Sequence, residues 1–295
     1  MISPRSIAGW LRRADPRFYQ IAVLSSLLIY GAAGLGFDVR PSHAAAILLA
    51  ALAAQYACGK WAGLATFDPL SALISALSLC LLLRTNSLAA AIAAAVVAIA
   101  SKFVIRAGGA HIFNPTNFAI VVMLLCSAGW VSPAQWGSRV WFATLVAGLG
   151  FLVVQRSSRW DVTVAFLAAW AGLLFGRALY LGDPLSIPLR QVQGGALLIF
   201  AFFMISDPKT TPRARQGRLL FACLVALGAF VIQFVLYRTN GLLWSLVALC
   251  PLVPLINRLL PGPRYAWRAH PASTHSRHTI PSRHTVPLHP KGALT

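Results

Sequence analysis

A short polar segment, Asn114-Pro115-Thr116-Asn117, separates two apolar stretches of the chain. Asn is favoured at a helix N-cap and Pro at the first helical position, so we expect a helix to begin here. Gly108 and Gly109 precede the segment and allow a ligand to approach the backbone closely. Lys102 and Arg106 add positive charge nearby. Glycines, cations and a helix N-terminus together favour the binding of a phosphate group.

A second polar segment, Asp207-Pro208-Lys209-Thr210-Thr211, closes a short apolar run that Gly194 and Gly195 open. A carboxylate at the end of an apolar run is costly unless a cation or water compensates it. Lys209 and Arg213 are near enough in sequence to do so. Two interpretations of Asp207 therefore stay open, a structural cap and a contact to a ligand.

The sequence contains no Walker A, HExxH or GxSxG motif. No pair of acidic residues lies within one apolar run, as a proton or sodium relay often requires. The five cysteines occur one to an apolar run and without a CxxC motif, which indicates small apolar fillers. The alternative, an iron–sulfur centre inside the membrane, would need about four thiolates to converge. We expect no metal site.

The chain that holds these residues has the composition of a membrane protein. Of its 295 residues, 58% are hydrophobic, 11% are charged, and the six acidic residues are all Asp. Soluble domains have about 25% charged residues, so a soluble enzyme, a disordered chain and a disulfide-rich secreted domain are excluded. The net charge of +19 comes from cations that lie between apolar runs. This placement follows membrane topology and argues against a nucleic-acid partner.

Apolar runs of about 17–25 residues can cross the bilayer as helices. The sequence predicts an all-α polytopic protein with about ten such helices, two of which, near 70–83 and 194–205, are short. The runs lie at 19–36, 43–65, 70–83, 88–105, 115–130, 139–154, 161–181, 194–205, 219–237 and 241–260.

An even number of crossings places both termini on one side of the membrane. Nineteen of the 25 Lys and Arg residues fall on that side, and the other six are Arg40, Arg84, Arg139, Arg177, Arg190 and Arg238. The positive-inside rule then predicts cytoplasmic termini in a bacterial-type inner membrane.

We divide the chain into a cytoplasmic segment, 1–18, a transmembrane domain, 19–260, and a disordered tail, 261–295. The tail is rich in His, Pro and Arg. Its histidines could bind a metal weakly, but attraction to anionic lipid headgroups is the simpler interpretation.

The transmembrane domain divides into two similar halves, about 19–130 and 139–260. Each half contains a short apolar run, then a polar turn, a full-length run, a second polar loop and a last run. With five crossings in each half, the two copies are inverted in the membrane. Short spans at matching positions point to a binding site near the middle of the bilayer. The alternative is that the short spans are tilted neighbours in a thin region.

These elements resemble the NqrB/RnfD family, which contains membrane subunits of the sodium-pumping NADH:quinone reductase and of the Rnf ferredoxin:NAD oxidoreductase. The likeness covers most of residues 20–260. The matching motifs are Ser71-Ala72-Leu73, Ser101-Lys102, His111-Ile112-Phe113-Asn114-Pro115, Gly194-Gly195 and Phe202-Phe203-Met204-Ile205-Ser206-Asp207-Pro208.

The resemblance implies ten helices in two inverted repeats, electron transfer coupled to cation movement, partner subunits of a redox complex, and a flavin cofactor. Full-length members of the family link FMN to a Thr in a Ser/Thr-Gly-Ala-Thr motif after the Asn-Pro helix. The corresponding region, Ser127 to Ser138, has no such motif. We therefore expect FMN or riboflavin bound non-covalently.

Besides an assembly subunit without a ligand of its own, two functions remain open at this point. The first is an electron-transfer subunit whose cofactor site includes Lys102, Gly108, Gly109, Asn114, Asn117, Gly194, Gly195, Asp207, Lys209 and Thr210. The second is a transporter or channel for small solutes or ions that uses the same scaffold without redox activity. The Asn-Pro and Asp-Pro motifs favour the first function, and the missing flavin-linkage motif favours the second.

Overall fold

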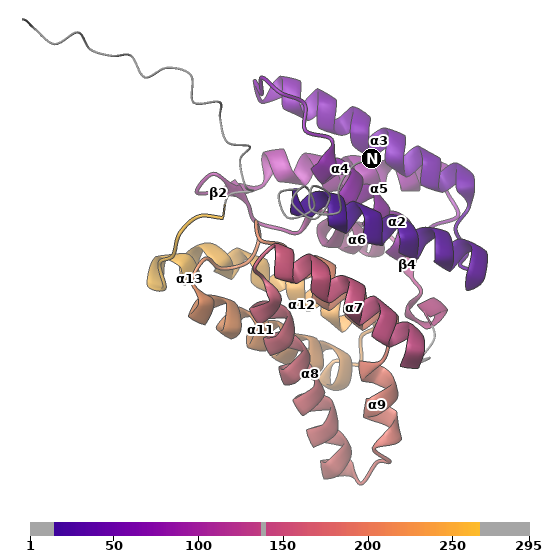
Figure 1. Cartoon of the computed structure of the whole chain (residues 1–295), viewed down its shortest axis with the longest axis vertical. Helices are drawn as coiled ribbons and strands as arrows, with labels where there is room; N and C mark the ends of the chain where they lie inside the picture. Colours follow the sequence, from indigo (N-terminus) through magenta and orange to yellow (C-terminus); the bar gives the residue numbers. More distant parts are fainter. Residues whose placement is uncertain (1–14, 137–139, 266–295) are drawn as a thin grey trace, which may run out of the picture. The chain divides into compact units, whose positions relative to one another are not determined.

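Each predicted apolar run forms a helix in the computed structural model, which describes residues 15–136 and 140–265 (Figure 1). The first half contains α2 (Pro16–Gly34), α3 (Pro41–Trp61), α4 (Leu70–Leu82), α5 (Leu88–Val104) and α6 (Pro115–Leu125). The second half contains α7 (Val140–Arg156), α8 (Trp160–Leu181), α9 (Ser186–Val192), α10 (Gly195–Ile199) with the π-helical turn η2 (Phe200–Met204), α11 (Arg215–Phe230) with the π-helical turn η3 (Val231–Val235), α12 (Gly241–Leu249), the 3-10 turn η4 (Cys250–Leu252) and α13 (Val253–Leu259). Most of the predicted N-terminal segment and tail lies outside the described residues.

Several helices begin where their capping residues predict. Asn114 accepts a hydrogen bond from the backbone N–H of Asn117, with Pro115 at the first position of α6. Ser87 caps α5 in the same way through the backbone N–H of Ala90. At the other end of a helix, Gly182 terminates α8 with a left-handed φ of 72°.

Two pairs of short strands connect the helices of the first half. β1 (Leu83–Arg84) pairs antiparallel with β4 (Trp130–Val131), so the predicted run 115–130 ends as a helix at Leu125 and finishes in a strand. The 3-10 turn η1 (Pro133–Trp136) follows β4. β2 (Arg106–Ala107) and β3 (Ala110–His111) form a hairpin.

Helix length supports only part of the predicted ten crossings. Four helices in the described residues are long and apolar enough to cross a membrane: Pro41–Trp61, Trp160–Leu181, Arg215–Val235 and Gly241–Leu259. A fifth candidate is the pair Ser186–Val192 and Gly195–Met204, which is bent by 45°. The sequence predicted only the second member of this pair, as the short run 194–205. Four further apolar helices, α4, α5, α6 and α7, have 10–17 residues.

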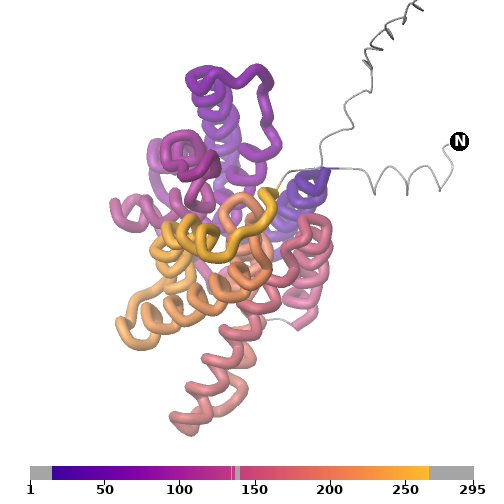
Figure 2. The backbone as a smooth tube through the Cα atoms, turned by 90° about the vertical axis from the view of Figure 1, so that its left-hand side faces the viewer, coloured from indigo at the N-terminus to yellow at the C-terminus, as the bar shows by residue number. Residues whose placement is uncertain are grey.

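The helices of the two halves pack in matching pairs. In the first half α3 packs on α5, α2 on α4, and α5 on α6. In the second half α8 packs on α11, α7 on α10, and α11 on α12. The halves meet where α2 contacts α7 and where α6 contacts α12, as both views of the chain show (Figures 1 and 2). When α9 is set aside, helices at the same place in the order of each half thus make these three contacts in common.

Candidate functional site

The Asn-Pro and Asp-Pro motifs meet at a polar junction between the two halves, formed by His111, Asn114 and Asp207. The side-chain amide of Asn114 donates to the carbonyl oxygen of Met204 at 3.4 Å and lies 3.5 Å from Oδ2 of Asp207. His111 Nε2 lies 3.9 Å from the same carboxylate oxygen. The structure therefore brings together two motifs that are about 90 residues apart in sequence.

Asp207 also organises the loop that follows it. Its Oδ1 accepts from the backbone N–H of Lys209 at 3.0 Å, and its carbonyl oxygen accepts from the hydroxyls of Thr210 and Thr211. Burial alone would raise the pKa of the Asp207 carboxyl, but His111 and the Lys209 backbone N–H hold that pKa below its ordinary value. Asp207 is thus a structural cap and an electrostatic partner of His111.

Asn117 lies in the first turn of α6 and joins it to α12. Its side-chain amide donates to the carbonyl oxygen of Leu243 at 3.1 Å, and its buried Oδ1 has no hydrogen-bond partner among the described residues. Asn117 is 1% exposed. Both asparagines of the Asn-Pro segment therefore bridge the two halves of the protein.

Lys102 is held within the first half. Its Nζ donates to Oε1 of Gln55 at 2.9 Å and to Oγ of Ser71 at 3.2 Å. This buried ammonium links α3, α4 and α5.

The two glycine pairs lie in different places. Gly108 and Gly109 occupy the β2–β3 turn with φ of 56° and 82°, as a two-residue hairpin of this type requires. Gly195 instead packs against Trp136, since an added Cβ would lie 2.8 Å from the Trp136 Cβ. Gly108, Gly109 and Gly195 thus have structural reasons for being glycine.

A large cavity, which we call the aromatic cavity, lies beside Gly194 and between the two halves. Its volume is about 830 Å³, within the range of about 300–1,000 Å³ that is typical of ligand pockets. Its walls are mostly apolar, and its charged lining residues are Arg190 and Arg238. Among the lining residues are Trp130, Val131, Pro133, Trp170, Gln191, Gly194, Phe200, Met204, Gln233, Tyr237, Thr239 and Asn240.

Of the ten residues predicted to bind a cofactor, only Gly194 lines the aromatic cavity. Gly108, Gly109 and Lys209 line a separate cleft. Sequence reasoning missed Trp170, Gln233 and Tyr237, because their positions within long apolar runs do not show which face they occupy. Trp130 and the turn Arg238-Thr239-Asn240 were visible as an aromatic residue and a polar turn near the ends of spans, but nothing in the sequence placed them together.

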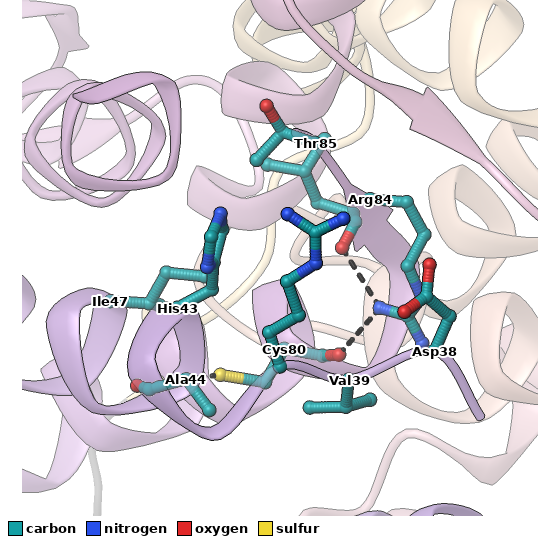
Figure 3. A pocket seen from close by; sticks show the side chains of 10 residues that line it. Asp38, Val39, His43, Ala44, Ile47, Cys80, Arg84 and Thr85 are labelled. Carbon is teal, nitrogen blue, oxygen red and sulfur yellow. Dashed lines mark hydrogen bonds between the residues drawn. The ribbon is translucent and has the colours of Figure 1, made fainter. Parts of the chain in front are cut away.

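A third cavity, shown in Figure 3, lies between α3 and the end of α4. Arg84 Nη1 donates to the carbonyl oxygens of Cys80 and Leu83, each at 2.8 Å. The Nε of Arg84 and the Nε2 of His43 are buried and have no hydrogen-bond partner in the part of the chain that the structure describes. The volume of about 30 Å³ is enough for a water molecule and too small for a cofactor. We interpret this cavity as structural.

Comparison with known proteins agrees with the resemblance seen in the sequence. Residues 129–265 match the NQR2, RnfD, RnfE family. Similar proteins are the D subunit of the ion-translocating oxidoreductase complex of Citrobacter koseri, 31% identical over 141 residues, and its counterpart from Escherichia coli O1:K1, 30% identical over 141 residues. Each alignment covers 48% of this chain and 38% of the relative. The aligned part of the chain therefore spans less than half the length of these relatives.

Proposed function

We propose that this chain, whose residues 129–265 match the NQR2, RnfD, RnfE family, is an electron-carrying membrane subunit of an ion-translocating oxidoreductase complex. The match itself carries the proposal, because the relatives that align here are the D subunits of such complexes. In this role the chain has the lipid bilayer and other subunits of the complex as partners, and its electron transfer is coupled to cation movement.

The aromatic cavity is the proposed site of a non-covalent flavin. Trp130 and Trp170 offer flat apolar surfaces to a ring system, and Arg190 and Arg238 offer positive charge to a phosphate. A flavin would supply electron transfer at this place, which side chains alone do not provide. Trp130 also belongs to the segment that stands where the family carries its flavin-linkage motif, which supports this position for the cofactor.

The proposed architecture is a pair of inverted five-helix repeats with cytoplasmic termini in the inner membrane. The matching helix pairs support the repeat. The contacts between the halves join α2 to α7 and α6 to α12, each to the helix at the same place in the other half, and a two-fold axis between the halves would produce such contacts. The aromatic cavity then lies at the interface of the repeats, where such folds place their ligand sites.

The test is an absorbance and fluorescence spectrum of the full chain, purified in mild detergent, before and after acid denaturation. We expect flavin bands that move into the supernatant on denaturation. The variants Trp130→Leu and Arg238→Gln should retain less flavin than the wild type. The matched variants Trp61→Leu and Arg215→Gln, at exposed positions outside the cavity, should retain as much.

Flavin that stays on the denatured chain would show covalent attachment and contradict this form of the proposal. A folded protein without flavin would refute the flavin site. Solute or ion flux in liposomes would then test the alternative, a transporter or channel on the same scaffold.

A further inference from the structure

A strongly basic cleft lies where the β2–β3 hairpin of the first half faces the loop after Asp207 and helix α13. Its volume is about 450 Å³. Five of its lining residues are cationic: Arg106, Lys209, Arg213, Arg258 and Arg264. None of its lining residues is Asp or Glu. The basic cleft shares no lining residue with the aromatic cavity.

The positive charge of the basic cleft is left largely uncompensated. No ion pair within the described residues involves any of its five cations. The Nη2 of Arg106 donates one hydrogen bond to the carbonyl oxygen of Gly109 at 2.7 Å. The nearby carboxylate of Asp207 is already engaged with Asn114, His111 and the backbone of Lys209.

The structure holds the walls of the cleft in place with ordinary protein contacts. The backbone N–H of Arg213 donates to Oδ1 of Asn257 at 2.8 Å, which ties the loop to α13. Among the described residues, no atom lies within 4 Å of where a Cβ would stand at Gly108 or Gly109, so the hairpin turn faces open space. Arginine guanidinium groups bind phosphate oxygens in a forked geometry, and several cations around one concave surface concentrate anions there.

The positive-inside rule explains why cations lie on this side of the membrane, but it does not require them to converge. Arg215, close in sequence to Arg213, is exposed and does not line the cleft. We propose that the basic cleft binds the phosphate group of an anionic ligand, supplied by an acidic phospholipid headgroup or by a soluble nucleotide. This site is independent of the proposed flavin site.

The proposal is tested by titrating the full chain in neutral detergent with two probes, short-chain phosphatidylglycerol and ADP, while recording its melting temperature. Short-chain phosphatidylcholine and sodium chloride at matched ionic strength are the control titrants. We expect at least one phosphate probe to raise the melting temperature in a saturable way that added salt weakens.

The decisive variant combines Lys209→Gln with Arg258→Gln. Both side chains are exposed and make no hydrogen bond or ion pair within the described residues, so the variant should fold normally. We expect the probe to bind it about tenfold or more weakly. The control combines Lys60→Gln with Arg215→Gln, which removes the same charge outside the cleft and should bind as the wild type does.

Saturation by phosphatidylglycerol alone would identify a lipid site, and saturation by ADP alone a nucleotide site. Equal binding to the two double variants, or binding of neither phosphate probe, would overturn the proposal. Because neither probe is a flavin, failure here would leave the flavin measurement unaffected, and the reverse also holds.

Discussion

The ion pair between Asp161 and Arg218 should contribute strongly to the stability of the second half. Asp161 is 6% exposed in the first turn of α8, and Arg218 lies in the first turn of α11. The Nε and Nη2 atoms of Arg218 lie 2.8 Å and 2.5 Å from Oδ2 of Asp161. The remaining Nη1 donates to the carbonyl oxygen of Arg213 at 2.7 Å. The pair therefore joins two helices and a wall of the basic cleft.

Removing one member of this pair should be costly. The substitution Asp161→Asn keeps the side-chain size but leaves Arg218 without its partner carboxylate and removes a negative charge near the buried Arg159. Burial and the charge of Arg218 already lower the pKa of Arg159, and Asp161 opposes this shift. Breaking a buried ion pair on one side costs about 3–5 kcal/mol. We expect that loss for Asp161→Asn and for Arg218→Met.

The assay is thermal unfolding of the purified protein in detergent, followed by tryptophan fluorescence. For a chain of this size, a loss of about 1 kcal/mol lowers the melting temperature by roughly 2–4 °C. The double variant Asp161→Leu with Arg218→Met should lose clearly less than the sum of the two single losses, because neither charge is left unpaired.

Helix α8 offers a matched control at its other end. Arg177 and Asp183 form a pair at 3.4 Å whose side chains are 35% and 36% exposed. An exposed pair contributes about 0–1 kcal/mol, so Asp183→Asn should change the melting temperature little. If Asp161→Asn melted like Asp183→Asn, the inference that burial makes the first pair important would be wrong.

Three further predictions concern packing, capping and pH. Gly150→Val should destabilise the protein by about 1–3 kcal/mol, because an added Cβ would lie 2.5 Å from the Phe202 Cγ. Gly148→Val adds its side chain in open space and should not destabilise it. Thermal unfolding of the two variants makes the comparison. In the same assay, Asn114→Ala should lower the free energy of unfolding by about 1 kcal/mol or more, since it removes the α6 cap and the hydrogen bond to Met204. Ser87→Ala removes only the cap of α5 and should lower it less. The pKa of the Asp207 carboxyl is lowered in the folded state. Its contribution to the free energy of unfolding is therefore present above its pKa in the unfolded chain, about 3.9, and is lost as the pH falls through its pKa in the folded protein. Melting temperatures between about pH 5 and about pH 3 should therefore fall more steeply for the wild type than for Asp207→Asn.

The positions of the helices could be predicted from the sequence because apolar runs, capping residues and prolines act locally. Asn114 with Pro115 marked the start of α6, and Gly194 the start of α10. Helix ends were harder to predict. Trp130 and Val131 are apolar enough to continue α6, yet they form β4, which pairs with Leu83 and Arg84. The sequence does not show this pairing, because the partner strand is far away along the chain.

The candidate site was only partly visible in the sequence. The charge and motif arguments identified Asn114 and Asp207, and the structure brings them together. The sequence does not show that Lys102 has its own partners on α3 and α4, because these contacts join residues 47 and 31 positions apart. It also does not show that Gly194 and Gly108 line different spaces.

The two π-helical turns have a consequence for the shape of the aromatic cavity. A π turn holds about one residue more than an α turn and is often found at functional sites. Within the described residues both π turns, η2 and η3, lie in the second half, and both supply walls of the aromatic cavity, through Phe200, Met204 and Gln233. Deleting one residue from either turn should restore an α-helix and rotate the side chains on one side of the deletion by about 100°. The extra residue in each turn thus helps to decide which side chains face the aromatic cavity.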